Sequence, residues 1–137
     1  MNFKKRIIFI TLCIFSLIIG GLIYVIFRGN THIAKIFPWK ESVIFLRKHL
    51  WVLECDFLKY YLPDFLWAFS LCSGLHSIFI PSAKVSIVCS LTVIIFGTLY
   101  EFLQLINIIS GTFDFLDILT YILGSVIITL INLVGEK

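Results

Sequence analysis

The stretch GTLYEFLQLINIISGTFDFLDILTYILG, residues 97–124, decides the fold, because here a strongly apolar sequence contains acidic side chains. Glu101 and Gln104 lie three residues apart, as do Asp114 and Asp117. Residues at this spacing share one face of a helix. Polar side chains inside a membrane are costly and usually face a bundle interior or a wet cavity. The stretch therefore predicts two membrane helices that bring a functional polar cluster together.

Composition predicts the class of protein. Hydrophobic residues make up 60% of the 137 residues and charged residues only 14%, whereas a soluble domain typically carries about 25% charged residues. The mean hydropathy is +1.05. We expect an all-α polytopic membrane protein, one domain over residues 1–137, with the lipid bilayer as its partner. The basic residues are scattered among apolar runs, which does not favour a nucleic-acid interface.

Four apolar segments are long enough, or nearly so, for the span of about 20 residues that a bilayer requires. The predicted membrane helices cover residues 7–27, 64–80, 85–107 and 114–133. The first is longer than the apolar core of a cleaved signal peptide, so we keep it as a span. Within it, Ser16 and Gly20 form a small-xxx-small pattern that would let another helix approach closely. The alternative is a glycine tolerated in a lipid-facing helix.

Residues 39–60 form a polar, aromatic segment between the first two spans. Its apolar residues recur every three or four positions, as at Leu46, Leu50 and Leu53. This pattern predicts an amphipathic helix at the membrane surface. A solvated loop with one charged face is the alternative.

The short connections predict the orientation. The basic N-terminus, Lys84 and Lys137 fall on one side, which the positive-inside rule assigns to the cytoplasm. Both termini are then cytoplasmic, and the basic segment containing Arg47 and Lys48 lies outside.

In this topology the acidic residues converge on one extracytoplasmic pocket. Asp64 begins the second span, Glu101 and Gln104 lie near the outer end of the third, and Asp114 and Asp117 begin the fourth. Gln104 and Tyr121 are the expected hydrogen-bond partners of Glu101. As alternatives, Asp114 and Asp117 could cap a helix, and Asp64 could stabilise a helix dipole.

Clustered carboxylates in a low dielectric must share protons, bind a cation or recruit basic groups. Arg47 and Lys48 are the first candidates for the basic groups. No resident cofactor is expected, although Glu101, Asp114 and Asp117 could together ligate a hard divalent cation.

The order of three motifs resembles the VanZ-like family of small bacterial membrane proteins, whose namesake is associated with teicoplanin resistance. The motifs are LPDFLW at 62–67, Glu101-x-x-Gln104, and GTFDFLD at 111–117, followed by Tyr121 and Gly124. The resemblance covers residues 58–130 and implies a bacterial cytoplasmic membrane and a contribution to glycopeptide resistance. Many members of the family have Arg in the loop before the final Asp, where this chain has Gly111 and Thr112, and Asn where it has Tyr121.

Three functions fit these residues. The first is a non-enzymatic envelope protein whose pocket binds a surface ligand such as an envelope lipid or a glycopeptide. The second is an enzyme that acts on an envelope lipid, with Glu101 and Asp117 as acid and base or as ligands of a divalent cation. The third is a cation- or proton-coupled transporter that uses Glu101 and His76 as a relay. A homo-oligomer remains open, and a hydrogen-bonded structural role for His76 is the alternative to a relay.

Overall fold

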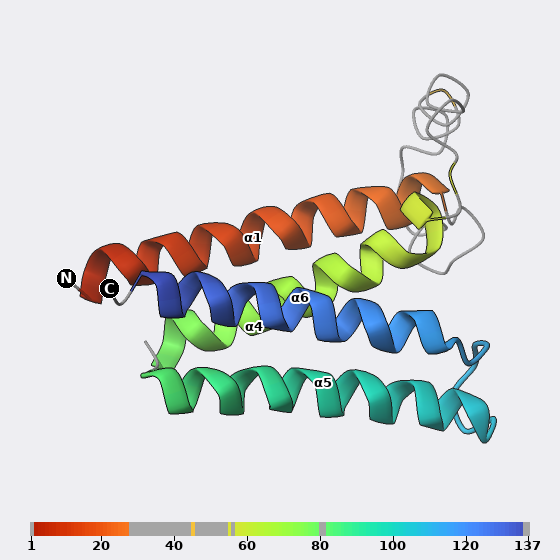
Figure 1. Cartoon of the computed structure of the whole chain (residues 1–137). Helices are drawn as coiled ribbons and strands as arrows, with labels where there is room; N and C mark the ends of the chain where they lie inside the picture. Colours follow the sequence, from red (N-terminus) through yellow and green to blue (C-terminus); the bar gives the residue numbers. More distant parts are fainter. Residues whose placement is uncertain (1, 28–44, 46–54, 56, 80–81, 136–137) are drawn as a thin grey trace.

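The computed structural model of the chain describes residues 2–27, 45, 55, 57–79 and 82–135. The elements are α1 (Asn2–Phe27), η2 (Phe57–Tyr61), α4 (Leu62–Phe79), α5 (Ala83–Leu105) and α6 (Phe115–Val134). The four α-helices run side by side and alternate in direction (Figure 1). The prediction of an all-α chain is confirmed for the described residues, which contain no strand.

Three of the four helices are long and apolar enough to cross a membrane. These segments are Phe3–Phe27, Ala83–Leu105 and Phe115–Val134. Together they identify a helical membrane protein. The helix α4 is not among them, because its 18 residues include Asp64 and His76, which lower its mean hydropathy. It nevertheless runs between the same two ends of the bundle as its neighbours (Figure 1).

The bundle is apolar outside and polar inside. Large apolar side chains such as Phe15, Phe96 and Leu130 are more than half exposed, as suits contact with lipid tails. The buried polar residues are Ser16, Ser70, Ser73, His76, Ser86, Ser90, Glu101, Thr120, Ser125, Thr129 and Asn132. Small and hydroxylated residues at helix interfaces are typical of membrane bundles, where hydrogen bonds and close packing hold the helices together.

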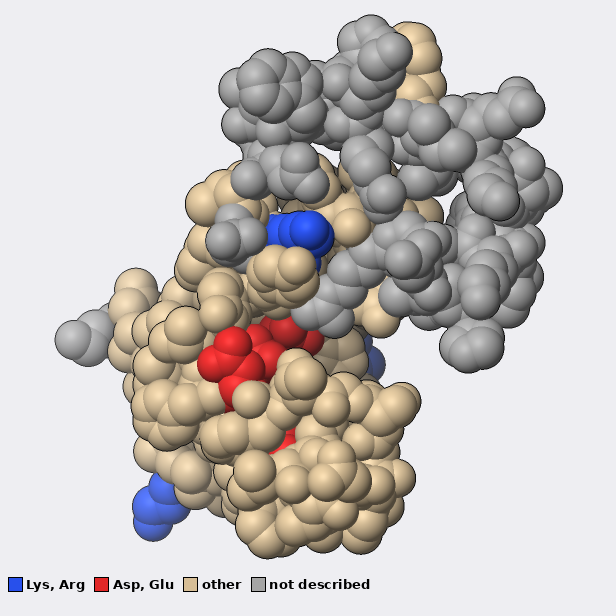
Figure 2. Space-filling view, turned by 90° about the vertical axis from the view of Figure 1, so that its right-hand side faces the viewer, with Lys and Arg blue, Asp and Glu red and all other residues tan. Residues whose placement is uncertain are grey.

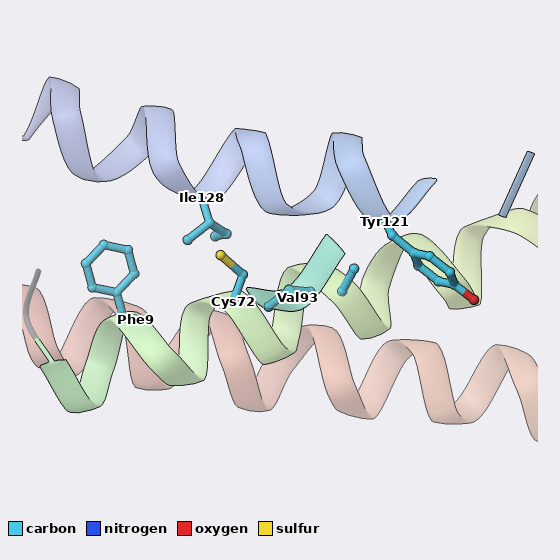
Figure 3. Close-up of a cluster of buried hydrophobic side chains, with 6 residues drawn as sticks. Phe9, Cys72, Val93, Tyr121 and Ile128 are labelled. Atoms are coloured by element: carbon cyan, nitrogen blue, oxygen red, sulfur yellow. The ribbon is translucent and has the colours of Figure 1, made fainter. Parts of the chain in front are cut away.

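A small apolar cluster joins the helices along the bundle axis. It consists of Phe9, Ala68, Cys72, Val93, Tyr121 and Ile128 (Figure 3). Glycines allow the close approaches around it. A β-carbon at Gly124 would lie 2.8 Å from the Phe65 carbonyl oxygen, so α6 and α4 touch through their backbones.

The predicted close approach at Gly20 is confirmed. A β-carbon there would lie 3.3 Å from the Leu66 β-carbon, so α1 packs closely on α4. The hydroxyl of Ser70 on α4 also donates a hydrogen bond to the Cys13 carbonyl of α1, at 2.8 Å. The neighbouring Gly21 has nothing within 4 Å and faces away from the bundle.

Several helix boundaries differ from the prediction. The helix α1 begins at Asn2 rather than residue 7, because lysine and arginine favour a helix as well as apolar residues do. The helix α5 ends at Leu105, not 107, since Asn107 takes the left-handed conformation with φ 58°. The helix α4 begins at Leu62, directly after the π-helical turn η2.

Most of the predicted amphipathic segment 39–60 lies outside the described residues, as do Arg47 and Lys48. The two chain ends lie at the same end of the bundle (Figure 1), since a β-carbon at Gly135 would lie 3.8 Å from Lys5 Cε.

Candidate functional site

A pocket of about 530 Å³ lies at the end of the bundle opposite the chain termini. Figure 2 faces this end and shows Asp and Glu side chains gathered in a hollow. The described lining residues are Tyr24, Tyr60, Tyr61, Asp64, Tyr100, Glu101, Gln104, Ser110, Gly111, Thr112, Asp114, Asp117 and Tyr121. They include four carboxylates and five tyrosines but no Lys, Arg or His. Thus the structure brings all six predicted site residues to one pocket.

Glu101 forms the floor of the pocket and is only 1% exposed. The Tyr121 hydroxyl donates a hydrogen bond to Glu101 Oε1 at 3.1 Å. The backbone N–H of Asp114 donates to Oε2 at 3.2 Å. Each carboxylate oxygen therefore has a partner, one from α6 and one from the loop before it. This compensates part of the cost of burying the group.

Tyr121 reaches Glu101 because α5 carries a glycine beside it. A β-carbon at Gly97 would collide with the Tyr121 ring. The Trp67 ring of α4 packs edge-on against Tyr121, with 5.9 Å between ring centroids. The phenol is thus held between α4 and α5, with its hydroxyl directed at Glu101.

Asp114 organises the start of α6. Its Oδ1 accepts the Leu116 N–H at 2.9 Å, which makes it the N-cap. Its Oδ2 accepts the Tyr61 hydroxyl at 3.0 Å. The capping alternative therefore describes the observed geometry of Asp114, although this residue also lines the pocket.

Asp64 and Asp117 line the pocket from the first turns of α4 and α6. A carboxylate in a first turn is favoured by the partial positive charge of the helix N-terminus. This position explains how two further acids are accommodated beside Glu101.

Gln104 does not take the predicted role. Among the described residues Glu101 bonds to Tyr121 and Asp114, and the Gln104 side chain instead packs on the α5–α6 loop. A β-carbon at Gly111, whose φ is +154°, would lie 2.5 Å from Gln104 Oε1. The glycine therefore lets the loop close over Gln104.

Sequence reasoning missed Tyr24, Tyr60, Tyr61 and Tyr100 as lining residues. Tyr24 and Tyr100 each lie near one end of a long aliphatic helix, and this position is the signal that could have identified them. At the rim, Lys59 Nζ stands 5.0 Å from the centroid of the Tyr60 ring.

The metal prediction finds no support in the geometry of the described residues. They contain no group of three or more His, Cys, Asp or Glu side chains arranged to hold a metal ion. Both oxygens of Glu101 and of Asp114 already accept hydrogen bonds. All four cysteines are free thiols.

His76 lies outside the pocket, near the opposite end of α4, and is fully buried. Its Nδ1 is 2.8 Å from the Cys72 carbonyl oxygen and its Nε2 is 2.6 Å from Ser86 Oγ. The expectation of a hydrogen-bonded histidine inside the bundle is confirmed, and no contact joins it directly to Glu101 among the described residues.

In comparisons with known proteins, no family model, no curated protein and no solved structure matches the chain.

Proposed function

We propose that the chain is a VanZ-like envelope protein of the bacterial cytoplasmic membrane whose acidic pocket opens to the outside and binds a surface ligand. The observation that carries the proposal is the convergence of carboxylates and tyrosines from α1, η2, α4, α5 and α6 on one pocket. Its volume of about 530 Å³ falls within the roughly 300–1,000 Å³ typical of small-molecule sites. A metal ion alone would leave most of it empty.

The chemistry of the lining favours a polar ligand with a cationic group. Carboxylates favour a nearby positive charge. Tyrosine faces attract ammonium and guanidinium groups, and the Lys59 ammonium already lies over the Tyr60 ring at the rim. The headgroup of an envelope lipid and an amine-bearing part of a glycopeptide both have this character.

The test is antibiotic susceptibility in a sensitive Gram-positive host. We expect the wild-type chain to raise the teicoplanin concentration that inhibits growth, with vancomycin as the comparison. Asp117→Asn and Glu101→Gln remove a negative charge from the lining at little change in volume, and both should abolish protection at unchanged membrane abundance.

Glu136→Gln, which removes a carboxylate beyond Gly135 at the end of the chain, is the matched control and should protect like the wild type. Absence of protection by wild type at matched abundance would contradict the resistance function. Equal protection by wild type and Asp117→Asn would contradict the role of the pocket.

A further inference from the structure

The acidic pocket reaches the side of the bundle as well as its end. Tyr100 lines the pocket and is also 47% exposed. It lies one helical turn from Phe96, which is 65% exposed on the outer surface of α5. The pocket wall and the lipid-facing surface of α5 therefore meet at Tyr100.

Tyr100 lies on the side of α5 that faces α4. Val93, seven residues before it, belongs to the apolar cluster that also contains Ala68 and Cys72 of α4 (Figure 3). Residues seven apart lie on the same face of a helix. Tyr100 therefore stands at the border between α5 and α4, nearer to the pocket end than Val93.

The helices α4 and α5 touch at the end of the bundle that carries the chain termini and diverge toward the pocket (Figure 1). Where they touch, His76 Nε2 lies 2.6 Å from Ser86 Oγ, and Cys72 Sγ lies 3.5 Å from Ser90 Oγ. At the pocket end the Tyr121 ring of α6 stands between the two helices. An aromatic ring, and not direct packing of the two helices, thus fills this part of their border.

Trp67 is the counterpart of Tyr100 on α4. It is 42% exposed, and its ring packs edge-on against Tyr121. It shares one face of α4 with the exposed Leu71 and with Asp64, which lines the pocket. Trp67 therefore lies between an apolar outer surface and an acidic wall.

The two aromatic residues lie at the same depth. Trp67 follows the first residue of α4 by five positions, and Tyr100 precedes the last residue of α5 by five. Each is therefore about 7.5 Å inside the helix end, at 1.5 Å per residue. Tryptophan and tyrosine are enriched at the level of the lipid headgroups. Anchoring a helix at the interface is their ordinary role, and it does not require them to border a pocket.

We propose that the ligand of the acidic pocket is a membrane lipid with an amine-bearing headgroup, which enters from the bilayer between Trp67 and Tyr100. This inference rests on the proposed function, because it names the class of ligand that the same pocket binds. The ammonium group lies among the pocket carboxylates. The acyl chains stay in the bilayer, against Trp67 and Leu71.

Charge and shape select this class of ligand. The described lining contains four carboxylates and no Lys, Arg or His, so it attracts an ammonium group and repels a phosphate. The phosphate of such a lipid lies between the amine and the glycerol, and it can remain at the rim, where the Lys59 ammonium lies. A lipid matches both the acidic pocket and the apolar surface beside it, whereas a water-soluble ligand gains nothing from access through the bilayer.

Quenching of tryptophan fluorescence tests the proposal, because the chain has only three tryptophans. The full chain with Trp39→Phe and Trp51→Phe, which leaves Trp67, is reconstituted in bilayers of equal parts phosphatidylethanolamine and phosphatidylglycerol. In one sample only the first lipid carries bromine on its acyl chains, and in the other only the second. The headgroup composition is the same in both samples and both leaflets, so the quenching ratio reports which lipid lies against Trp67.

We expect brominated phosphatidylethanolamine to be preferred at Trp67 by roughly twofold or more, the factor that one exposed cation–π contact supplies. Asp117→Asn should reduce the ratio toward one, whereas Glu136→Gln, which follows the end of α6, should keep it. Equal quenching by the two lipids without these substitutions would overturn the proposal.

Phe15 supplies the matched control for position. It is 64% exposed on α1 and does not line the pocket. With Trp67→Phe also in place, Phe15→Trp should be quenched equally by the two lipids. The same preference at both positions would overturn the proposal, because the amine lipid would then simply gather around the whole protein. Every variant must elute as a single species in detergent, and Asp64→Asn replaces Asp117→Asn if the latter does not.

The outcome separates the lipid from the proposed function. Equal quenching in a chain that protects cells against teicoplanin would remove the lipid as the ligand and leave the resistance function of the pocket. A preference for the amine lipid in a chain that gives no protection would keep the lipid and contradict the resistance function.

Discussion

Glu101 shows how this chain tolerates a buried carboxylate inside an apolar bundle. The residue is 1% exposed, and its two oxygens accept one side-chain and one backbone hydrogen bond. Both donors come from the chain that follows α5, so Glu101 also ties the start of α6 to α5. The proposed ligand-binding role and this structural role thus fall on one residue, and substitutions must separate them.

Gly97 is the residue whose substitution tests how Tyr121 reaches Glu101. Gly97→Ala places a β-carbon against the Tyr121 ring, so the ring or the helix must move. We expect a loss of about 1–3 kcal/mol in unfolding free energy, the usual cost of overpacking. The measurement is the unfolding of the purified protein in mixed micelles as denaturing detergent increases.

The control for this prediction is Gly21→Ala, at a glycine with nothing within 4 Å of the added β-carbon. It should be neutral or stabilising, because alanine favours a helix over glycine by up to about 1 kcal/mol. Equal losses in the two variants would show that the effect comes from the helix backbone and not from the Tyr121 contact.

At this scale the sequence predicted the acidic residues of the pocket but not the residues that position them. Glu101 could be identified because a charged side chain in the middle of an apolar membrane helix costs free energy and is rarely present without a function or a partner. Nothing in the sequence distinguishes Gly97, whose added β-carbon would meet the Tyr121 ring, from Gly21, which touches none. Only the rotation of each helix about its own axis decides this, and that rotation is set by tertiary packing.

Substitution of Asp114 tests what stabilises the start of α6. Its Oδ1 caps the helix and its Oδ2 accepts from Tyr61, so Asp114→Ala removes both bonds. Loss of an N-cap alone costs about 0.5–2 kcal/mol. Asp114→Asn keeps a good capping oxygen and should unfold close to wild type in the same micelle titration. If both variants lose the same stability, the charge of Asp114 matters more than its cap.

The existence of the helices was predictable, because a helix that spans a bilayer must be long and largely apolar, and both properties can be read from the sequence. The start of α6 was predicted to within one residue from the capping signal at Asp114. The start of α1 and the end of α5 were not, because hydropathy ignores helix propensity at Lys4–Arg6 and the left-handed conformation of Asn107. The turn η2 has no sequence signal, since a π-helical turn depends on where the flanking helix docks.

The arrangement of the whole molecule places its most polar helix where lipid has least access. The helix α4 packs against α1, α5 and α6 and contributes buried Ser70, Ser73 and His76 to the interior. A helix with few lipid contacts does not need an apolar surface all round. This explains why α4 is less apolar than a typical membrane span and yet runs the length of the bundle (Figure 1).

The predicted topology requires that α4 cross the bilayer. If α4 crosses the bilayer, Cys55 before η2 and Ser82 before α5 lie on opposite sides, and Cys55 faces outward when the termini are cytoplasmic. Both residues are exposed. A membrane-impermeant maleimide should therefore label the native Cys55 in intact cells. In a Cys55→Ser background, Ser82→Cys should be labelled only after the membrane is permeabilised. Labelling of both sites in intact cells would mean that α4 does not cross, and the reverse pattern would place the acidic pocket in the cytoplasm, where it could not meet a glycopeptide outside the cell.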